Sequence, residues 1–172
     1  MRALPSVEGT SSADDLIVAA LVLGFILWRQ LQPRSVREDS PYRLVLVLGV
    51  VGVVDLVGFA DAHHVNAMAW SLLAASLVVG CLFGVLRGET VHIWRRDGVL
   101  VRQGNAITVV LWAAGLGIHV LVDELINGVD SSASGIGADT ILLYLGVALA
   151  AQRFTTLRRA GQRNRLTSAQ SR

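Results

Sequence analysis

A polar, patterned segment between two long apolar runs most constrains how this chain can fold. The segment covers residues 87–112, RGETVHIWRRDGVLVRQGNAITVVLW. Residues 90–96 and 99–103 have the composition and alternation of two short strands. Asp97-Gly98 separates them, and this dipeptide favours a two-residue hairpin turn because Asp and Gly tolerate a positive φ best. The sequence therefore predicts a β-hairpin over residues 89–104.

A two-residue turn also fixes which residues of the hairpin face each other. It pairs Trp94 with Val101 and Arg95 with Leu100. Because a lone hairpin is marginal in water, we expect it to rest on the membrane surface or the helix ends. It is either a connector or a docking surface for a partner.

The composition places this hairpin in an integral membrane protein. Of the 172 residues, 53% are hydrophobic and 16% are charged, and the mean hydropathy is +0.56. A soluble domain of this size could not bury so much apolar side chain. We therefore expect an all-α bundle of transmembrane helices, with the hairpin between its third and fourth spans.

Five spans account for the apolar runs, although the first and fifth have short apolar cores. Residues 1–15 form an external segment, 16–157 the membrane domain, and 158–172 a basic, disordered cytoplasmic tail. Residues 123–139 are expected to be a loop because they are acidic, small and flexible. The expected spans are about 14–31, 42–62, 65–86, 106–126 and 139–157.

The distribution of charge sets the expected orientation. All fifteen basic residues are Arg, and fourteen of them lie in the segments that would face the cytoplasm. Arg2 is the exception. Eight carboxylates lie on the other side. Since positive residues favour the cytoplasmic side, the N-terminus is predicted outside and the C-terminus inside.

Small residues mark one face of the third span. Ser76, Gly80 and Gly84 recur every four residues, so they share a helical face. Such a face lets a neighbouring helix approach closely. Chance is the alternative, because Gly is frequent in membrane helices.

Polar residues within the spans form the candidate intramembrane site. Asp55 interrupts the second span, and a carboxylate in hydrocarbon costs about 2.5–3.5 kcal/mol on insertion scales. His119 lies at a similar depth in the fourth span, so an Asp55–His119 contact is geometrically possible. Asp123 is one helical turn from His119. These residues either serve structure or carry a proton or ion.

Two further histidines, His63 and His64, lie in the turn after the second span. Imidazole groups suit a divalent metal or a haem iron, so these two are candidate ligands on the outer side. The alternative is that they are ordinary turn residues, since no motif with metal-ligand spacing is present.

Glycine, arginine and tryptophan residues mark the hairpin and the helix ends beside it: Gly84, Arg87, Gly88, Trp94, Gly98, Arg102, Gly104 and Trp112. In these residues, the segment 72–120 resembles the CcdC-like family of small bacterial integral membrane proteins. The resemblance implies a multi-span protein associated with cytochrome c maturation genes, and it supplies no catalytic residues.

Taken together, these features predict a non-enzymatic accessory or assembly factor of the bacterial plasma membrane. A small proton- or ion-coupled transporter using Asp55 and His119 is one alternative, and a haem- or metal-binding protein is another. The expected partners are the bilayer, its anionic inner leaflet and a membrane protein or second copy, but no nucleic acid. The hairpin residues expected to meet a partner are Arg87, Gly88, Trp94, Gly98, Arg102 and Trp112.

The orientation can be tested with reporter fusions. Fusions after Arg37, Gly98 and Arg165 should report a cytoplasmic location, and fusions at residues 10, 64 and 132 an external one, because of the Arg asymmetry. A cytoplasmic signal at Ser132 would contradict the arrangement of the last two spans.

Overall fold

The structure is a computed structural model that describes residues 43–96 and 99–170, with Gly24, Trp28, Gln32, Arg34 and Ser35; side chains at the end of the chain are described through Arg163. All contacts below lie within residues 33–172, which form one unit. The elements are β1 (Arg34–Ser35), α2 (Arg43–Ala62), α3 (Ala67–Thr90), β2 (His92–Arg96), β3 (Val99–Gln103), α4 (Ala106–Val129), η1 (Ser131–Ala133) and α5 (Ile136–Gln170).

Helices α2, α3, α4 and α5 are each long and apolar enough to cross a membrane. They correspond to the second to fifth spans expected from the sequence. The first expected span lies outside the described residues, apart from Gly24 and Trp28. The described part of the chain is thus mainly helical, as its composition predicts.

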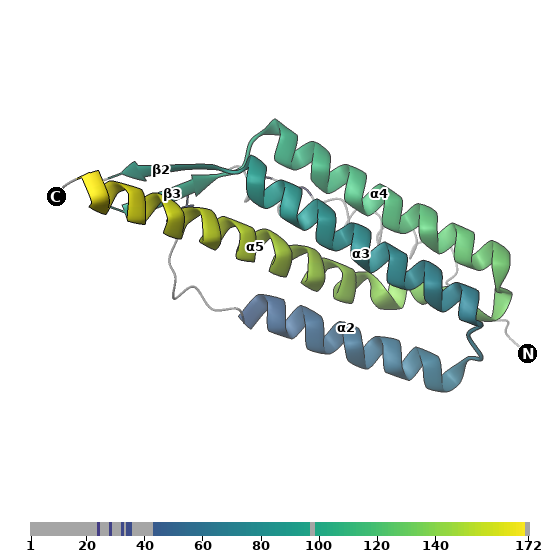
Figure 1. The fold of residues 1–172 in the computed structure, drawn as a ribbon. Helices are drawn as coiled ribbons and strands as arrows, with labels where there is room; N and C mark the ends of the chain where they lie inside the picture. Colours follow the sequence, from purple (N-terminus) through teal and green to yellow (C-terminus); the bar gives the residue numbers. More distant parts are fainter. Residues whose placement is uncertain are drawn as a thin grey trace, which may run out of the picture. The chain divides into compact units, whose positions relative to one another are not determined.

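The helices are arranged in the order α4, α3, α5, α2, and each packs on the next (Figure 1). Helix α5 therefore has a neighbour on two sides. The β-sheet lies beside the C-terminal part of α5, and we call this end of the bundle the sheet end. The opposite end carries the loops at residues 63–66 and 130–135.

Helix α5 lies against the small-residue face of α3. A Cβ added at Gly80 would come within 2.6 Å of the Tyr144 ring, and one added at Gly84 would collide with the carbonyl of Ala148. The same close approach continues at Gly88, where a Cβ would be 2.6 Å from Thr155. Because the residue numbers of both helices rise together along this contact, α3 and α5 run parallel.

Helix α2 packs on another side of α5, also through glycine. A Cβ at Gly52 would collide with the backbone of Leu143, and one at Gly146 would lie 3.1 Å from the amide nitrogen of Gly49. A step forward along α2 is a step back along α5, so these two helices are antiparallel.

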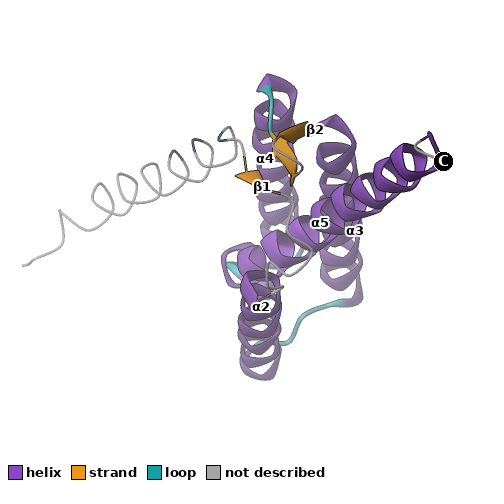
Figure 2. Cartoon of the chain, turned by 90° about the vertical axis from the view of Figure 1, so that its left-hand side faces the viewer, coloured by secondary structure: helices purple, strands orange, loops and turns teal. Residues whose placement is uncertain are grey.

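The hairpin has the register that the sequence predicts. Trp94 pairs with Val101 and Arg95 with Leu100 in the antiparallel pair of β2 and β3. The turn residues Asp97 and Gly98 lie outside the described residues. Figure 2 shows the strands at one end of the helices.

A third strand, β1, was not expected, because residues 29–43 read as a loop. It pairs with β3 on the side away from β2, with Arg34 opposite Arg102. Only two residues take part, and pairing of so few residues depends on a partner strand distant in the sequence.

Two expectations about loops and tails were wrong. Residues 123–129 continue α4, because Ile126 is 1% exposed and packs in a core with Ala133 and Ile136. The tail expected to be disordered from residue 158 instead extends α5 to Gln170. Arg159 and Arg163 of this extension bind backbone carbonyls next to and within β2.

Replacing Gly84 with Leu should separate α3 from α5. A bulky side chain there meets backbone, so we expect the free energy of unfolding in detergent to fall by about 1–3 kcal/mol. Gly117→Leu is the matched control, because a Cβ at Gly117 meets nothing within 4 Å. Equal melting temperatures for the two variants would show that the α3–α5 contact is not tight.

Candidate functional site

The C-terminus of α3 is closed at the sheet end by groups from three parts of the chain. The last four carbonyls of a helix have no partner within it. Here the Arg87 carbonyl accepts from the Thr90 hydroxyl at 3.1 Å, and the Gly88 carbonyl accepts from Arg159 at 2.7 Å. The Thr90 carbonyl accepts from the Asn105 amide at 3.1 Å.

Asn105 joins the end of α3 to the start of α4. Its side-chain oxygen accepts a hydrogen bond from the backbone N–H of Thr108 at 2.9 Å. The Thr108 hydroxyl in turn accepts one from the backbone N–H of Asn105 at 3.2 Å. This is a capping box, which satisfies two unpaired donors of a helix start. One side chain therefore serves both helices that flank the hairpin.

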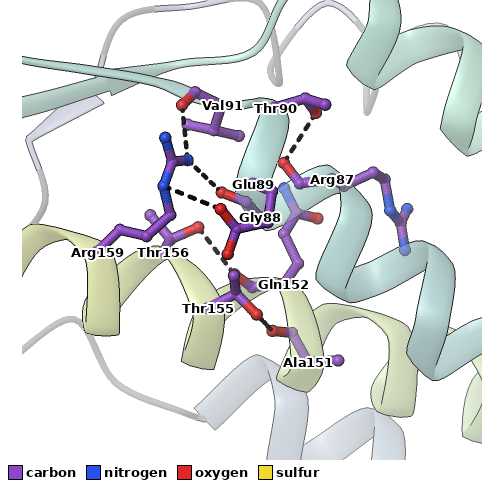
Figure 3. Close-up of polar contacts among 10 residues, drawn as sticks. All are labelled: Arg87, Gly88, Glu89, Thr90, Val91, Ala151, Gln152, Thr155, Thr156 and Arg159. Carbon is purple, nitrogen blue, oxygen red and sulfur yellow. Dashed lines mark hydrogen bonds and ion pairs between the residues drawn. The ribbon is translucent and has the colours of Figure 1, made fainter.

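Two arginines of α5 bind carbonyl groups on one edge of the hairpin. Arg159 donates to the Val91 carbonyl at 3.1 Å and pairs with Glu89 at 3.4 Å (Figure 3). Arg163 donates to the Ile93 carbonyl at 2.6 Å. Four helical residues advance about 6 Å and two strand residues about 6.6 Å. The two spacings match, so the helix covers a strand edge that would otherwise be open.

Arg87 lies inside the bundle, in the last turn of α3. It is only 2% exposed, and its guanidinium carbon lies 3.9 Å from the centre of the Trp112 ring. Its Nε donates to the Phe83 carbonyl at 3.2 Å. Among the described residues it forms no ion pair. The aromatic face and the negative end of the helix dipole stabilise this cation instead.

The residues expected at a hairpin surface are thus divided between the bundle and the sheet. Arg87, Gly88 and Trp112 are buried within the bundle. Trp94 and Arg102 lie on the sheet, where the Trp94 ring is 5.4 Å from His92. Gly98 lies outside the described residues.

His119 binds α3 and the start of α5 rather than Asp55. Its Nε2 is 3.2 Å from the Gly137 carbonyl, which can only accept, so this nitrogen carries the hydrogen. In the neutral ring, Nδ1 then accepts from the Ser76 hydroxyl at 3.0 Å. The ring stacks on Tyr144 at 4.5 Å. Both nitrogens therefore have partners within the bundle.

Asp123 binds the backbone N–H of the same residue of α5, Gly137. Its carboxylate accepts the Gly137 amide at 2.8 Å. This amide is in the first turn of α5, where donors lack helical partners and the helix dipole favours a negative charge. His119 and Asp123, one turn apart on α4, together fix the start of α5.

Asp55 makes no hydrogen bond or ion pair with His119. It lies on the face of α2 that carries the buried residues Gly52 and Phe59, which is the side that packs on α5. Among the described residues it makes no hydrogen bond or ion pair. Helix α2 makes its main contacts with α5, and both ring nitrogens of His119 already have other partners.

The loops at the opposite end are joined through Asp130. Its carboxylate accepts the Asn66 amide at 2.9 Å, while Asn66 caps the start of α3 by accepting the Ala69 amide at 2.8 Å. Hydrogen bonds lower the pKa of Asp130. The largest effect comes from the Ser132 hydroxyl, and a further one comes from the backbone N–H of Asn66. This interaction contributes stability at neutral pH that is lost as the pH falls below the usual carboxyl range.

The two outer histidines take part in the same loops. His63 lies 3.1 Å from the Phe59 carbonyl and stacks on the Phe59 ring. The His64 carbonyl oxygen lies 2.6 Å from the Ser132 hydroxyl oxygen, whose one hydrogen is shared between this carbonyl and the Asp130 carboxylate. Within the described part of the chain, no three His, Cys, Asp or Glu residues are grouped to hold a metal ion.

Comparisons with known proteins give no relative. No protein-family model matches the sequence, and no curated protein or solved structure shows significant similarity to it.

Sequence reasoning missed Asn105, Gly137, Tyr144, Arg159 and Arg163. Asn105 offered a usable signal, because Asn followed three residues later by Thr precedes an apolar run. The two arginines are one helical turn apart, but they fall in a stretch that reads as a basic tail. Nothing in the sequence pairs them with β2.

Replacing Asp123 with Ala should destabilise the start of α5. Losing a carboxylate that caps a helix typically costs about 0.5–2 kcal/mol, so unfolding in detergent should occur at a lower temperature. Glu124→Ala is the control, because Glu124 is the adjacent exposed carboxylate. Equal effects of the two substitutions would contradict the structural role of Asp123.

Proposed function

We propose that this chain is a non-enzymatic, multi-pass protein of the bacterial plasma membrane that acts as an accessory or assembly factor. Its partner would be another membrane protein, which contacts the small β-sheet on the cytoplasmic side. The resemblance of residues 72–120 to the CcdC-like family agrees with such a role. The proposal includes five spans, with the N-terminus outside.

The observation that carries the proposal is the attachment of the hairpin to α5. Neighbouring helices of a bundle are usually joined by about 2–8 residues, whereas residues 91–105 separate α3 from α4. Arg159 and Arg163 hold this longer segment at its edge. The attachment supports a hairpin that would be marginal on its own, and it also fixes the surface before a partner arrives, which favours binding.

The polar groups inside the bundle support the same reading. His119 uses both ring nitrogens, on Ser76 and Gly137, and Asp123 binds the start of α5. These contacts fix helix positions. A proton- or ion-coupled transporter using Asp55 and His119 is less well supported, because the two residues belong to different helix contacts.

Photo-crosslinking in cells tests the assembly role. A photoreactive residue at His92 or Val99, which are exposed strand positions, should give the same discrete adduct with one membrane protein. The control position is Val110, which is 64% exposed on α4 and should give none. In the double variant Arg159→Gln/Arg163→Gln the sheet adducts should be lost while the protein still inserts.

Three outcomes would contradict the proposal. Neither sheet position gives an adduct in the folded protein, or the adducts persist in the double variant, or the adduct contains two copies of this chain. The last result would indicate self-association in place of assembly of a different protein.

A further inference from the structure

One side of α5 at the sheet end carries a hollow that no described segment fills. Its volume is about 310 Å³, and it is lined by Leu157, Arg158, Gly161 and Gln162. Residues three and four positions apart share a helical face, so these side chains lie together. Because all four residues belong to α5, the hollow is a shallow depression that is open on its outer side.

Arg158 gives the hollow a cation that has no partner among the described residues. It is exposed, and among the described residues it makes no hydrogen bond or ion pair. The Glu89 carboxylate forms its ion pair with Arg159. A guanidinium binds phosphate oxygens through two parallel hydrogen bonds, and the Gln162 amide adds further donors.

Gly161 keeps the hollow open. A Cβ built at this position would meet nothing within 4 Å. The helix therefore has room for a ligand group against its backbone, and a larger residue here would fill the hollow without disturbing a neighbour.

The chemistry along this face changes in the order found in a phospholipid. Phe154 is 64% exposed one turn before Arg158, on the membrane side of the hollow, and Leu157 lines the hollow itself. Apolar residues come first, then the cation, then the amide. An acyl chain, a glycerol and a phosphate follow one another in the same order across a membrane surface.

We propose that this face of α5 binds an anionic phospholipid, with its phosphate on Arg158 and Gln162 and its acyl chain beside Phe154 and Leu157. The site lies on a different residue set from the sheet edge, and it does not depend on the proposed assembly role. A lipid bound here would occupy the exposed side of the helix that holds the hairpin.

Native mass spectrometry of the full chain in detergent tests this site. Titration with phosphatidylglycerol should show one lipid retained more tightly than phosphatidylcholine. Arg158→Gln should weaken this lipid about fivefold, the factor that corresponds to about 1 kcal/mol per Arg near an anionic surface. Gly161→Leu should weaken it by filling the hollow, and the melting temperature should not fall, because Leu is a better helix former than Gly.

Arg43→Gln is the matched control, because Arg43 is an exposed arginine at the start of α2, outside the hollow. It should leave retention of the lipid unchanged. Equal loss in Arg43→Gln and Arg158→Gln, or no loss in Arg158→Gln and Gly161→Leu, would overturn the site. Tight binding of inorganic phosphate that displaces the lipid would assign the hollow to free phosphate and overturn the lipid proposal.

Discussion

The close, parallel contact of α3 with α5 is the constraint on which the rest of the structure depends. Between membrane helices there is no hydrophobic driving force, so association relies on packing, and small residues let backbones approach. Gly80, Gly84 and Gly88 give α5 such a track. Because each glycine contacts a defined residue of α5, these contacts fix how far α3 and α5 are shifted along each other.

This relative position aligns polar groups at both ends of the contact. Towards one end, Tyr144 lies against Gly80 and stacks on the His119 ring. The Tyr144 hydroxyl donates to the Gly115 carbonyl at 2.7 Å. Towards the other end, Arg159 binds the Gly88 carbonyl. A shift of one helical turn, about 5.4 Å, would separate each of these pairs.

Helix ends leave backbone groups without partners inside the helix, and this chain satisfies several of them with side chains from neighbouring segments. Asn105 serves two helices at the sheet end, and Asp123 holds the first turn of α5. An unsatisfied backbone group in hydrocarbon costs several kcal/mol. The same contacts that remove this cost also fix how the helices pack on each other. Arg159 and Arg163, beyond the apolar part of α5, bind backbone carbonyls of the hairpin in the same way, whereas Arg158 is exposed.

Local sequence pattern was enough to predict four long, apolar helices and the register of the hairpin. Apolar length decides which segments are long enough to span a membrane, and the two-residue turn decides that Trp94 faces Val101. Only the tertiary structure decided which helices touch: that α5 occupies the glycine face of α3, that His119 binds Ser76 and Gly137, and that residues 158–170 are helical. Apolar periodicity says that a face is buried, but it does not name the helix that buries it. A basic segment likewise reads as a solvated tail until a strand edge is placed beside it, and that placement comes from contacts some seventy residues apart.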